Sequence, residues 1–505
     1  MKDSRNGWIA GFVFILLLII VPVWYFTRTD AAAEGQVIDR PWDHVPRRAE
    51  PVDHSSLMDQ PMTTGPEVTR ACLECHEDAA RQVMETAHWR WQADPVMMAG
   101  HDEPVAIGKK NAINNFCIGI QGNWSSCTSC HAGYGWEDET FDFSKADNVD
   151  CLVCHDTSGV YRKGKAGIPA EGVDLLTAAR SVGLPTRENC GGCHFRGGGG
   201  DAVKHGDLDE SLYYPDDELD VHMGRYGFQC IDCHQTRNHV IGGRAITVSV
   251  DNANQIACTD CHSDKLHADA RINAHTDTVA CQTCHIPRVA IKEATKVHWD
   301  WSEAGDPTRE ENVHEYLKIK GSFVYKKNLK PAFRWFNGLA GRYLLGDPLD
   351  DDGVTALNPP LGSIKDPDAR IWPFKIHDAL QPYDTQYNYL LQPVTSGKGG
   401  FWTEFDWDQA LRLGEGVTGL PYSGHYGFAA TEMYWPQTHM VAPKTRALQC
   451  QACHCPDGCL DWEALGYPGD PIRWGSRDRI RTAEQPQVGA GKRDSFAASA
   501  GAGEE

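Results

Sequence analysis

Hydrophobic residues form one long uninterrupted run near the start of the chain. Residues 7–26 are twenty consecutive positions without a charged side chain, long enough for a helix to cross a bilayer. Lys2 and Arg5 precede the run, and basic residues on that side favour a cytoplasmic N-terminus. A cleaved signal peptide is the alternative, because small residues follow at 31–33. The length of the run favours an uncleaved membrane anchor over residues 1–26.

Shorter patterns predict few regular elements. Apolar residues at helical spacing predict helices over 77–91 and 174–182. Alternating residues predict a strand over 245–250, and 317–325 has the pattern of a hairpin that turns at 321–322. The chain also has 49 glycines and 28 prolines. We therefore expect a mostly α-helical and irregular fold with a few short strands.

The 19 cysteines follow a strict pattern. A single C-x-x-C motif could be a redox dithiol or half of a zinc site, but here histidine follows at once all eight times. The two thiols of a C-x-x-C-H motif form thioethers to haem, and the histidine is placed to ligate the iron. The motif residues are Cys72, Cys75 and His76; Cys127, Cys130 and His131; Cys151, Cys154 and His155; Cys190, Cys193 and His194; Cys230, Cys233 and His234; Cys258, Cys261 and His262; Cys281, Cys284 and His285; and Cys450, Cys453 and His454.

These motifs predict a multihaem cytochrome c fold packed around eight covalently bound haems, on the outer side of a cytoplasmic membrane, because such attachment takes place outside the cytoplasm. The order of motifs divides the chain into regions. They are the anchor or uncleaved signal at 1–26, a stalk at 27–70, a haem-rich region at 71–285 with seven motifs, a haem-free wrapping region at 286–449, the eighth motif and closing segment at 450–475, and a disordered tail at 476–505.

Charge limits the partners. The formal net charge is −21, which makes nucleic acid an improbable partner and leaves a basic redox partner or a small anion drawn into a local basic pocket. The acidic loop 347–353 is a candidate calcium site. Its spacing does not fit an EF-hand, so a solvated turn is the favoured interpretation.

The chain has 22 histidines, of which fourteen lie outside the motifs. A haem that only transfers electrons commonly takes a second axial ligand, and with nine methionines in the chain we expect histidine in that role. His44 and His54 lie in the stalk and are expected to be exposed to solvent. The candidates for iron ligation opposite the motif histidines are His88, His222, His239, His275, His298, His377 and His439.

Several segments resemble one family. Residues 110–136 read KNAINNFCIGIQGNWSSCTSCHAGYGW, residues 197–206 read GGGGDAVKHG, and TEMYWPQTHMVAP at 431–443 precedes the eighth motif. Over residues 65–475 the chain resembles the octahaem tetrathionate reductase family of c-type cytochromes. The resemblance implies a catalytic cytochrome whose second haem is the active site, with a lysine from elsewhere on its iron and a cysteine nearby.

Carried onto this chain, the resemblance implies an active haem on Cys127 and Cys130, with Cys117 as the nearby thiol. Lys204 is the first candidate for the lysine ligand, and Lys163 is the second. An amine must be neutral to bind iron, and burial lowers the pKa of a lysine. Nearby in the sequence, Asp217 and Asp220 are candidate pocket residues, and with Lys204 and Cys117 they are the predicted catalytic groups.

Three functions remain open from the sequence. The first is a reductase of tetrathionate, nitrite or hydroxylamine, supplied by a quinol-linked or cytochrome donor at the membrane. The second is an electron conduit without chemistry of its own, and the third is an oxidase of hydroxylamine type. Cys455 and Cys459 depart from the family pattern, and in an oxidising compartment they are candidates for a disulfide.

Overall fold

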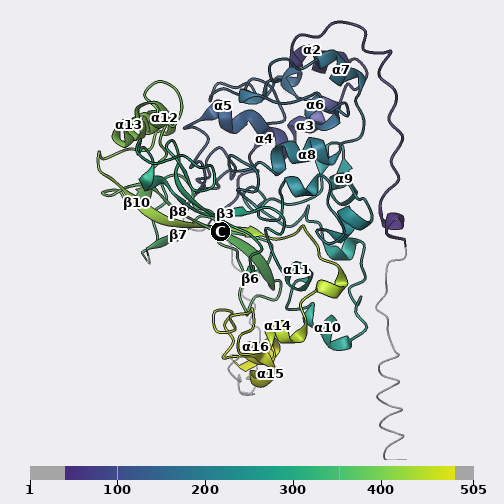
Figure 1. Ribbon diagram of the computed structural model, residues 1–505, viewed down its shortest axis with the longest axis vertical. Helices are drawn as coiled ribbons and strands as arrows, with labels where there is room; N and C mark the ends of the chain where they lie inside the picture. The colour runs from purple at the N-terminus through teal and green to yellow at the C-terminus, as the bar shows by residue number, and fades with distance from the viewer. Residues whose placement is uncertain (1–39, 99–100, 352, 484–505) are drawn as a thin grey trace, which may run out of the picture.

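The computed structural model describes residues 40–98, 101–351 and 353–483, and its helices are mostly short (Figure 1). Most of the C-x-x-C-H motifs form a single helical turn, in which the histidine amide donates to the carbonyl of the first cysteine, as at His76 and His234 (2.9 and 2.8 Å). This turn brings both thiols and the ring together. The helices are α2 Gly65–Leu73, α3 Ala79–Met84, α4 Ala87–Arg90, α5 Trp124–Cys127, α6 Leu152–His155, α7 Leu175–Arg180, α8 Arg187–His194, α9 Cys230–Cys233, α10 Ala270–His275, α11 Cys281–His285, α12 Phe401–Glu404, α13 Trp407–Thr418, α14 Cys450–Cys453, α15 Pro471–Trp474 and α16 Arg477–Ala483.

Two of the predicted short elements differ from the structure. The helix expected over 77–91 is split into α3 and α4, and Trp91 ends the second with a left-handed backbone (φ 49°). The segment 245–250 forms turns instead of a strand, because Ser249 donates its amide to Ala245 (2.9 Å) within the segment. The helix predicted over 174–182 is α7, capped by the Asp174 carboxylate.

The haem-free region contains an eight-stranded sheet, which is more β-structure than the few short strands expected. The order is β4-β5-β3-β8-β10-β7, and β6 and β9 also pair with the long central β8. The strands are β3 Thr295–Asp300, β4 Tyr316–Leu317, β5 Gly321–Lys326, β6 Ala332–Phe336, β7 Val354–Ala356, β8 Arg370–Asp384, β9 Tyr389–Leu390 and β10 Tyr426–Pro436, beside a separate pair β1 Thr236–Arg237 and β2 Val240–Ile241.

The predicted hairpin is present as β4 and β5, but its turn lies at 318–320, and Gly321 already belongs to the second strand. The sheet encloses an aromatic core that includes Trp299, Trp301, Phe374 and Trp435, each almost completely buried. Burying such large rings gives the region a core independent of haem. In Figure 1 the helices from α2 to α9 lie to one side of the sheet, and α14–α16 form a separate lobe below.

Residues 40–64, which we call the strap, lie against the haem-rich region. Trp42 packs edge-on against Phe228 (4.6 Å between ring centres), and Arg48 forms an ion pair with the buried Asp232 (2.6 Å). The described part of the predicted stalk is therefore docked along the protein surface.

The segment at 7–26, proposed as a membrane anchor, lies outside the described residues. Within 40–98, 101–351 and 353–483 no helix has the length and apolar character needed to cross a bilayer. The first part of the segment expected to be a disordered tail forms α16, and the remainder from 484 lies outside the described residues.

Candidate haem sites and catalytic centre

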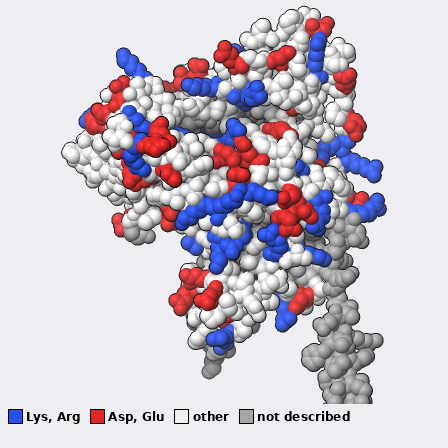
Figure 2. Space-filling model, viewed as in Figure 1, with Lys and Arg blue, Asp and Glu red and all other residues white. Residues whose placement is uncertain are grey.

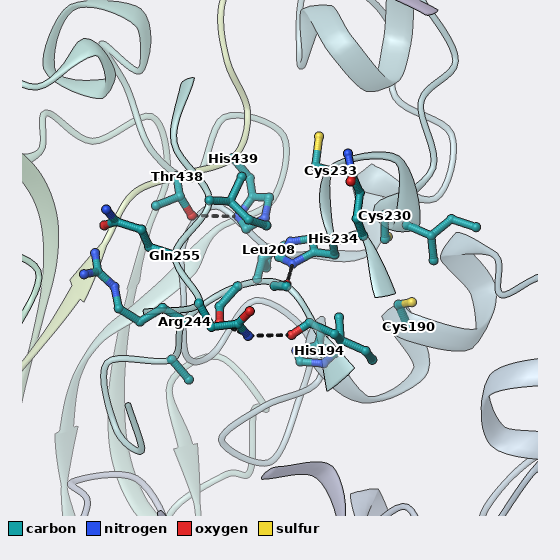
Figure 3. Close-up of a pocket in the computed structure, with 18 of the residues that line it drawn as sticks. Cys190, His194, Leu208, Cys230, Cys233, His234, Arg244, Gln255, Thr438 and His439 are labelled. Carbon is teal, nitrogen blue, oxygen red and sulfur yellow. Dashed lines mark hydrogen bonds between the residues drawn. The ribbon is translucent and has the colours of Figure 1, made fainter. Parts of the chain in front are cut away.

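A single cavity of about 3300 Å³ is lined by cysteines or histidines of the first seven motifs. Figure 3 shows one part of it, where Cys230 and Cys233 lie beside His234, and His439 approaches from another segment. The lining therefore combines pairs of thiols with imidazoles from distant parts of the chain. This donor set fits covalently bound haem c.

Seven motif histidines each face a second histidine, with ring centres 6.1–6.4 Å apart. A metal ion bonded to one nitrogen of each ring at about 2 Å separates the ring centres by roughly 6 Å. The spacing fits an iron between the rings of every pair. The pairs are His76 with His54, His155 with His239, His194 with His88, His234 with His439, His262 with His222, His285 with His267, and His454 with His275.

The hydrogen bonds of these histidines support the same arrangement. The Nδ1 atom contacts a protein oxygen in several of them, for example Gly242 O at His234 (2.7 Å) and Asp470 Oδ1 at His454 (2.7 Å). A partner on Nδ1 fixes the ring and leaves Nε2 directed toward a metal. The rings with such an Nδ1 contact are His54, His155, His234, His239, His275, His439 and His454.

Five of the seven histidines expected opposite a motif histidine occupy such a position, namely His88, His222, His239, His275 and His439. The structure corrects the other two. His377 is fully buried against Phe116 and hydrogen-bonds Asn115 (3.0 Å), and neither it nor His298 faces a motif histidine among the described ring contacts.

Their places are taken by His54, which was expected to be exposed in the stalk, and by His267, which sequence reasoning missed. No local pattern distinguishes His267 as an iron ligand. Its position between the sixth and seventh motifs could have made it a candidate.

The second motif is different, because His131 faces no second histidine among the described ring contacts. Its ring is completely buried among Trp89, Trp91 and Trp136 and two phenylalanines, and its Nε2 contacts the Trp89 carbonyl (2.7 Å). Burial lowers the pKa of His131 to about 4, so the ring is neutral and Nε2–H is the donor. The thiols of Cys127 and Cys130 line the cavity, whereas this histidine does not.

Lys204 lines the same cavity as the thiols of this motif. Its side chain is half-buried, and its ammonium lies 4.6 Å from the centre of the Trp435 ring. Burial lowers the pKa of Lys204 to about 7, and the positive charge of Lys109 adds to the shift. A pKa near neutrality makes the amine available as an iron ligand.

Lys163, the second candidate, is occupied elsewhere. Its ammonium forms an ion pair with the completely buried Asp150 (2.5 Å) and also donates to the Gly133 carbonyl (3.2 Å). Ligation of iron by this amine would leave Asp150 as a buried carboxylate without its counter-ion, which is costly. The geometry therefore favours Lys204.

Cys117 lies in a recess with several lysines. A side chain added at Gly199 (φ 93°) would lie 3.5 Å from the Cys117 sulfur and 3.8 Å from the Lys320 ammonium, so glycine leaves this space open. Lys320, Lys109 and Lys204 line the same cavity. Burial raises the pKa of the Cys117 thiol, and the neighbouring lysines oppose that shift. The recess is thus cationic and suits an anion.

The two predicted pocket carboxylates differ, because Asp220 lines the cavity and Asp217 does not. Asp217 forms a surface ion pair with Arg225 (2.9 Å), and Asp220 accepts from the amides of His222 and Met223 (both 2.9 Å), which positions His222. Sequence reasoning missed Asp201 and Asp207, which each lie three residues from Lys204, and Asp207 lines the cavity whereas Asp201 does not. Burial raises the pKa of Asp201 to about 6.

The motifs are packed against one another. The Cys130 and Cys193 side chains lie next to one another, and the Leu448 amide donates to the Cys284 carbonyl (2.9 Å), which joins the eighth motif to the seventh. Together the contacts give the order two, four, five, six, seven and eight, with the first and third motifs on a branch at the fourth. The Asn189 side chain also donates to the Asp156 carbonyl (2.9 Å). The other residues of different motifs that lie near one another are Cys72 and Cys151, Cys190 and Cys230, Cys233 and Cys261, and Cys258 and Cys281.

Two other expectations gain no support. Among the described residues no group of three His, Cys, Asp or Glu side chains is arranged for a metal ion, and Asp347 of the acidic loop contacts His101 (3.3 Å). Cys459 lies 3.8 Å from Cys453 of the eighth motif, whereas Cys455 is exposed, so the two extra cysteines do not face one another.

The paired histidines and the C-x-x-C-H turns define a multihaem c-type cytochrome. The sequence models of two families agree, "Cytochrome c bacterial" over residues 296–457 and "Cytochrome c7 and related cytochrome c" over 216–286. The crystal structure of octaheme cytochrome c from Shewanella oneidensis is 49% identical, with a TM-score of 0.79, over 84% of this chain and 98% of that chain. An uncharacterized protein of Archaeoglobus fulgidus is 26% identical over 247 residues, 39% of this chain and 82% of that protein. The chain belongs to the octahaem tetrathionate reductase family of c-type cytochromes.

Proposed function

We propose that this protein carries eight covalent haems and reduces small oxidised sulfur or nitrogen compounds, such as tetrathionate, nitrite or hydroxylamine, at the second haem. The observation that supports this most directly is the contrast between seven paired motif histidines and His131, which is turned into an aromatic cage. When bound, the second haem supplies an iron with a coordination site for substrate, and the others store and deliver electrons.

The side chains around the second motif have distinct tasks in this proposal. Lys204 would supply an amine ligand to the iron. Lys320 and Lys109 attract an anionic substrate into the recess beside Cys117 and hold it there by charge.

The location is also part of the proposal. Residues 7–26 anchor the protein in the cytoplasmic membrane, with the haem-bearing part on the outer side. A quinol-linked or cytochrome donor there would supply the electrons.

The test is turnover of the haem-loaded protein with a reduced viologen dye and tetrathionate, nitrite or hydroxylamine as oxidant. The Lys204→Ala variant should lose most turnover and also change the ligand-field spectrum of one haem. The matched Lys163→Met variant should keep the spectrum, because its ammonium is held by Asp150. If no oxidant supports turnover in a protein whose haems are all reduced by the dye, the electron-conduit function replaces this one.

A further inference from the structure

In one stretch of this acidic protein, every charged residue is basic. The chain has 69 acidic and 48 basic residues, yet no Asp or Glu lies between Glu315 and Asp347. Seven basic residues lie in that interval. They are Lys318, Lys320, Lys326, Lys327, Lys330, Arg334 and Arg342.

Three of these lysines lie at the end of β5 and in the connection to β6. Lys326, Lys327 and Lys330 are exposed, as is Arg370 at the start of β8, and none of the four forms an ion pair with a described residue. Figure 2 shows Lys and Arg side chains gathered in a band where Figure 1 places β6 and α11. We call these four residues the basic face.

The basic face lies beside the seventh and eighth motifs. The connection is joined to the chain just after His285, since the Asn328 amide donates to Ala290 (2.7 Å) and Leu329 pairs with Val289 (3.0 Å). Phe333 and Trp335 of β6, which follow Lys330, pack in one apolar cluster with Cys453 of the eighth motif. Next to Arg370, the Ile371 carbonyl accepts from the amide of Ala280 (3.0 Å), the residue before Cys281 of the seventh motif.

This position is the far end of the row of motifs from the proposed active site. The contacts described above lead from the second motif through the fourth, fifth and sixth to the seventh and eighth. Cys450 of the eighth motif is exposed, so a haem held there is within reach of another protein.

We propose that the basic face is the docking surface of an acidic electron-transfer protein, and that electrons enter through the eighth and seventh haems. In the transfer the partner loses one electron and a haem iron gains it, without a bond being made or broken. A partner with net negative charge is repelled by most of a protein of charge −21 and attracted by these unpaired cations. The overall charge predicts a basic partner, but the local charge over the motifs selects an acidic one.

The experiment uses reduced flavodoxin, an acidic flavoprotein, as the probe and follows haem reduction by stopped-flow absorbance without any oxidant. The variant is Lys326→Glu, Lys327→Glu and Lys330→Glu combined. The control is Lys145→Glu, Arg162→Glu and Lys165→Glu combined, three exposed residues without described ion pairs near the second and third motifs. Both variants change the net charge by the same amount.

At low salt we expect the variant to be reduced about tenfold more slowly than the wild type, while the control changes less than about twofold. The wild-type rate should fall as salt is added, because the attraction is screened. Equal slowing of both variants, or a wild-type rate that rises with salt, overturns the proposal.

Two further measurements keep the outcome clear. Absorbance spectra and haem content establish whether both variants are folded. If the triple variant of the basic face does not fold, the single variant Lys327→Glu is used in its place. Vesicles containing phosphatidylglycerol that capture the wild type but not the variant, with flavodoxin rates unchanged, would assign the face to a membrane surface and overturn the proposal. Since the readout needs no substrate, it does not depend on whether the proposed reductase function is correct.

Discussion

The aromatic cage around His131 allows ligation and packing to be separated by one substitution. If this histidine only fills the cage, His131→Ala removes a completely buried ring and its hydrogen bond to Trp89. Truncating a buried aromatic side chain typically costs about 3–5 kcal/mol. Imidazole is smaller and more polar than the Phe and Trp rings from which that range was obtained, which lowers the cost. The Trp89 carbonyl is also left without its hydrogen-bond donor, which raises the cost. We therefore expect the free energy of unfolding to fall by about 3 kcal/mol.

The comparison variant is His131→Phe, which keeps an aromatic ring in the cage and loses only the hydrogen bond. It should cost about 1 kcal/mol. Both variants should leave the near-infrared magnetic circular dichroism of the haems unchanged, because no iron loses a ligand. His54→Ala is the positive control, since it removes the ring that faces His76 at 6.2 Å and should create one high-spin haem.

Stability against pH gives a second readout of the same cage. The pKa of His131 is lowered to about 4 from 6.5 in the unfolded chain, so the unfolded state binds a proton first as pH falls. The wild type should lose stability from about pH 6.5 down to about pH 4, and His131→Phe should lack that part of the decline. A new high-spin haem in His131→Ala, with guanidinium unfolding unchanged, would refute the assignment of this ring to packing.

Other substitutions test the remaining assignments. His267→Ala should produce one high-spin haem by electron paramagnetic resonance, whereas His298→Ala should leave all haem signals as they are. Arg48→Ala removes the partner of a buried carboxylate and should release the strap, seen as faster proteolysis of residues 40–64, with a cost of up to about 3 kcal/mol. Lys163→Met should lower thermal stability by a similar amount through the unpaired Asp150, without a change in iron ligation.

The sequence predicted the chemistry more fully than the architecture. A C-x-x-C-H motif is a local device, because five consecutive residues in one helical turn suffice to hold a haem and offer its first iron ligand. The family resemblance likewise implied Lys204 and Cys117 from the residues around them. In contrast, the alternating pattern at 245–250 did not predict its turns, and the size of the sheet around β8 was underestimated.

By itself, then, the sequence determined where haem attaches and indicated that the second site is special. Only the tertiary structure decided which histidine faces which, because each such contact joins segments far apart in the chain, as His267 and His54 show. It also favours Lys204 over Lys163 as the iron ligand, since a buried carboxylate holds the amine of Lys163 and an aromatic ring lies beside that of Lys204. Burial and long-range contacts determine the free energy of placing a histidine or lysine at each site, and the local spacing of residues predicts neither.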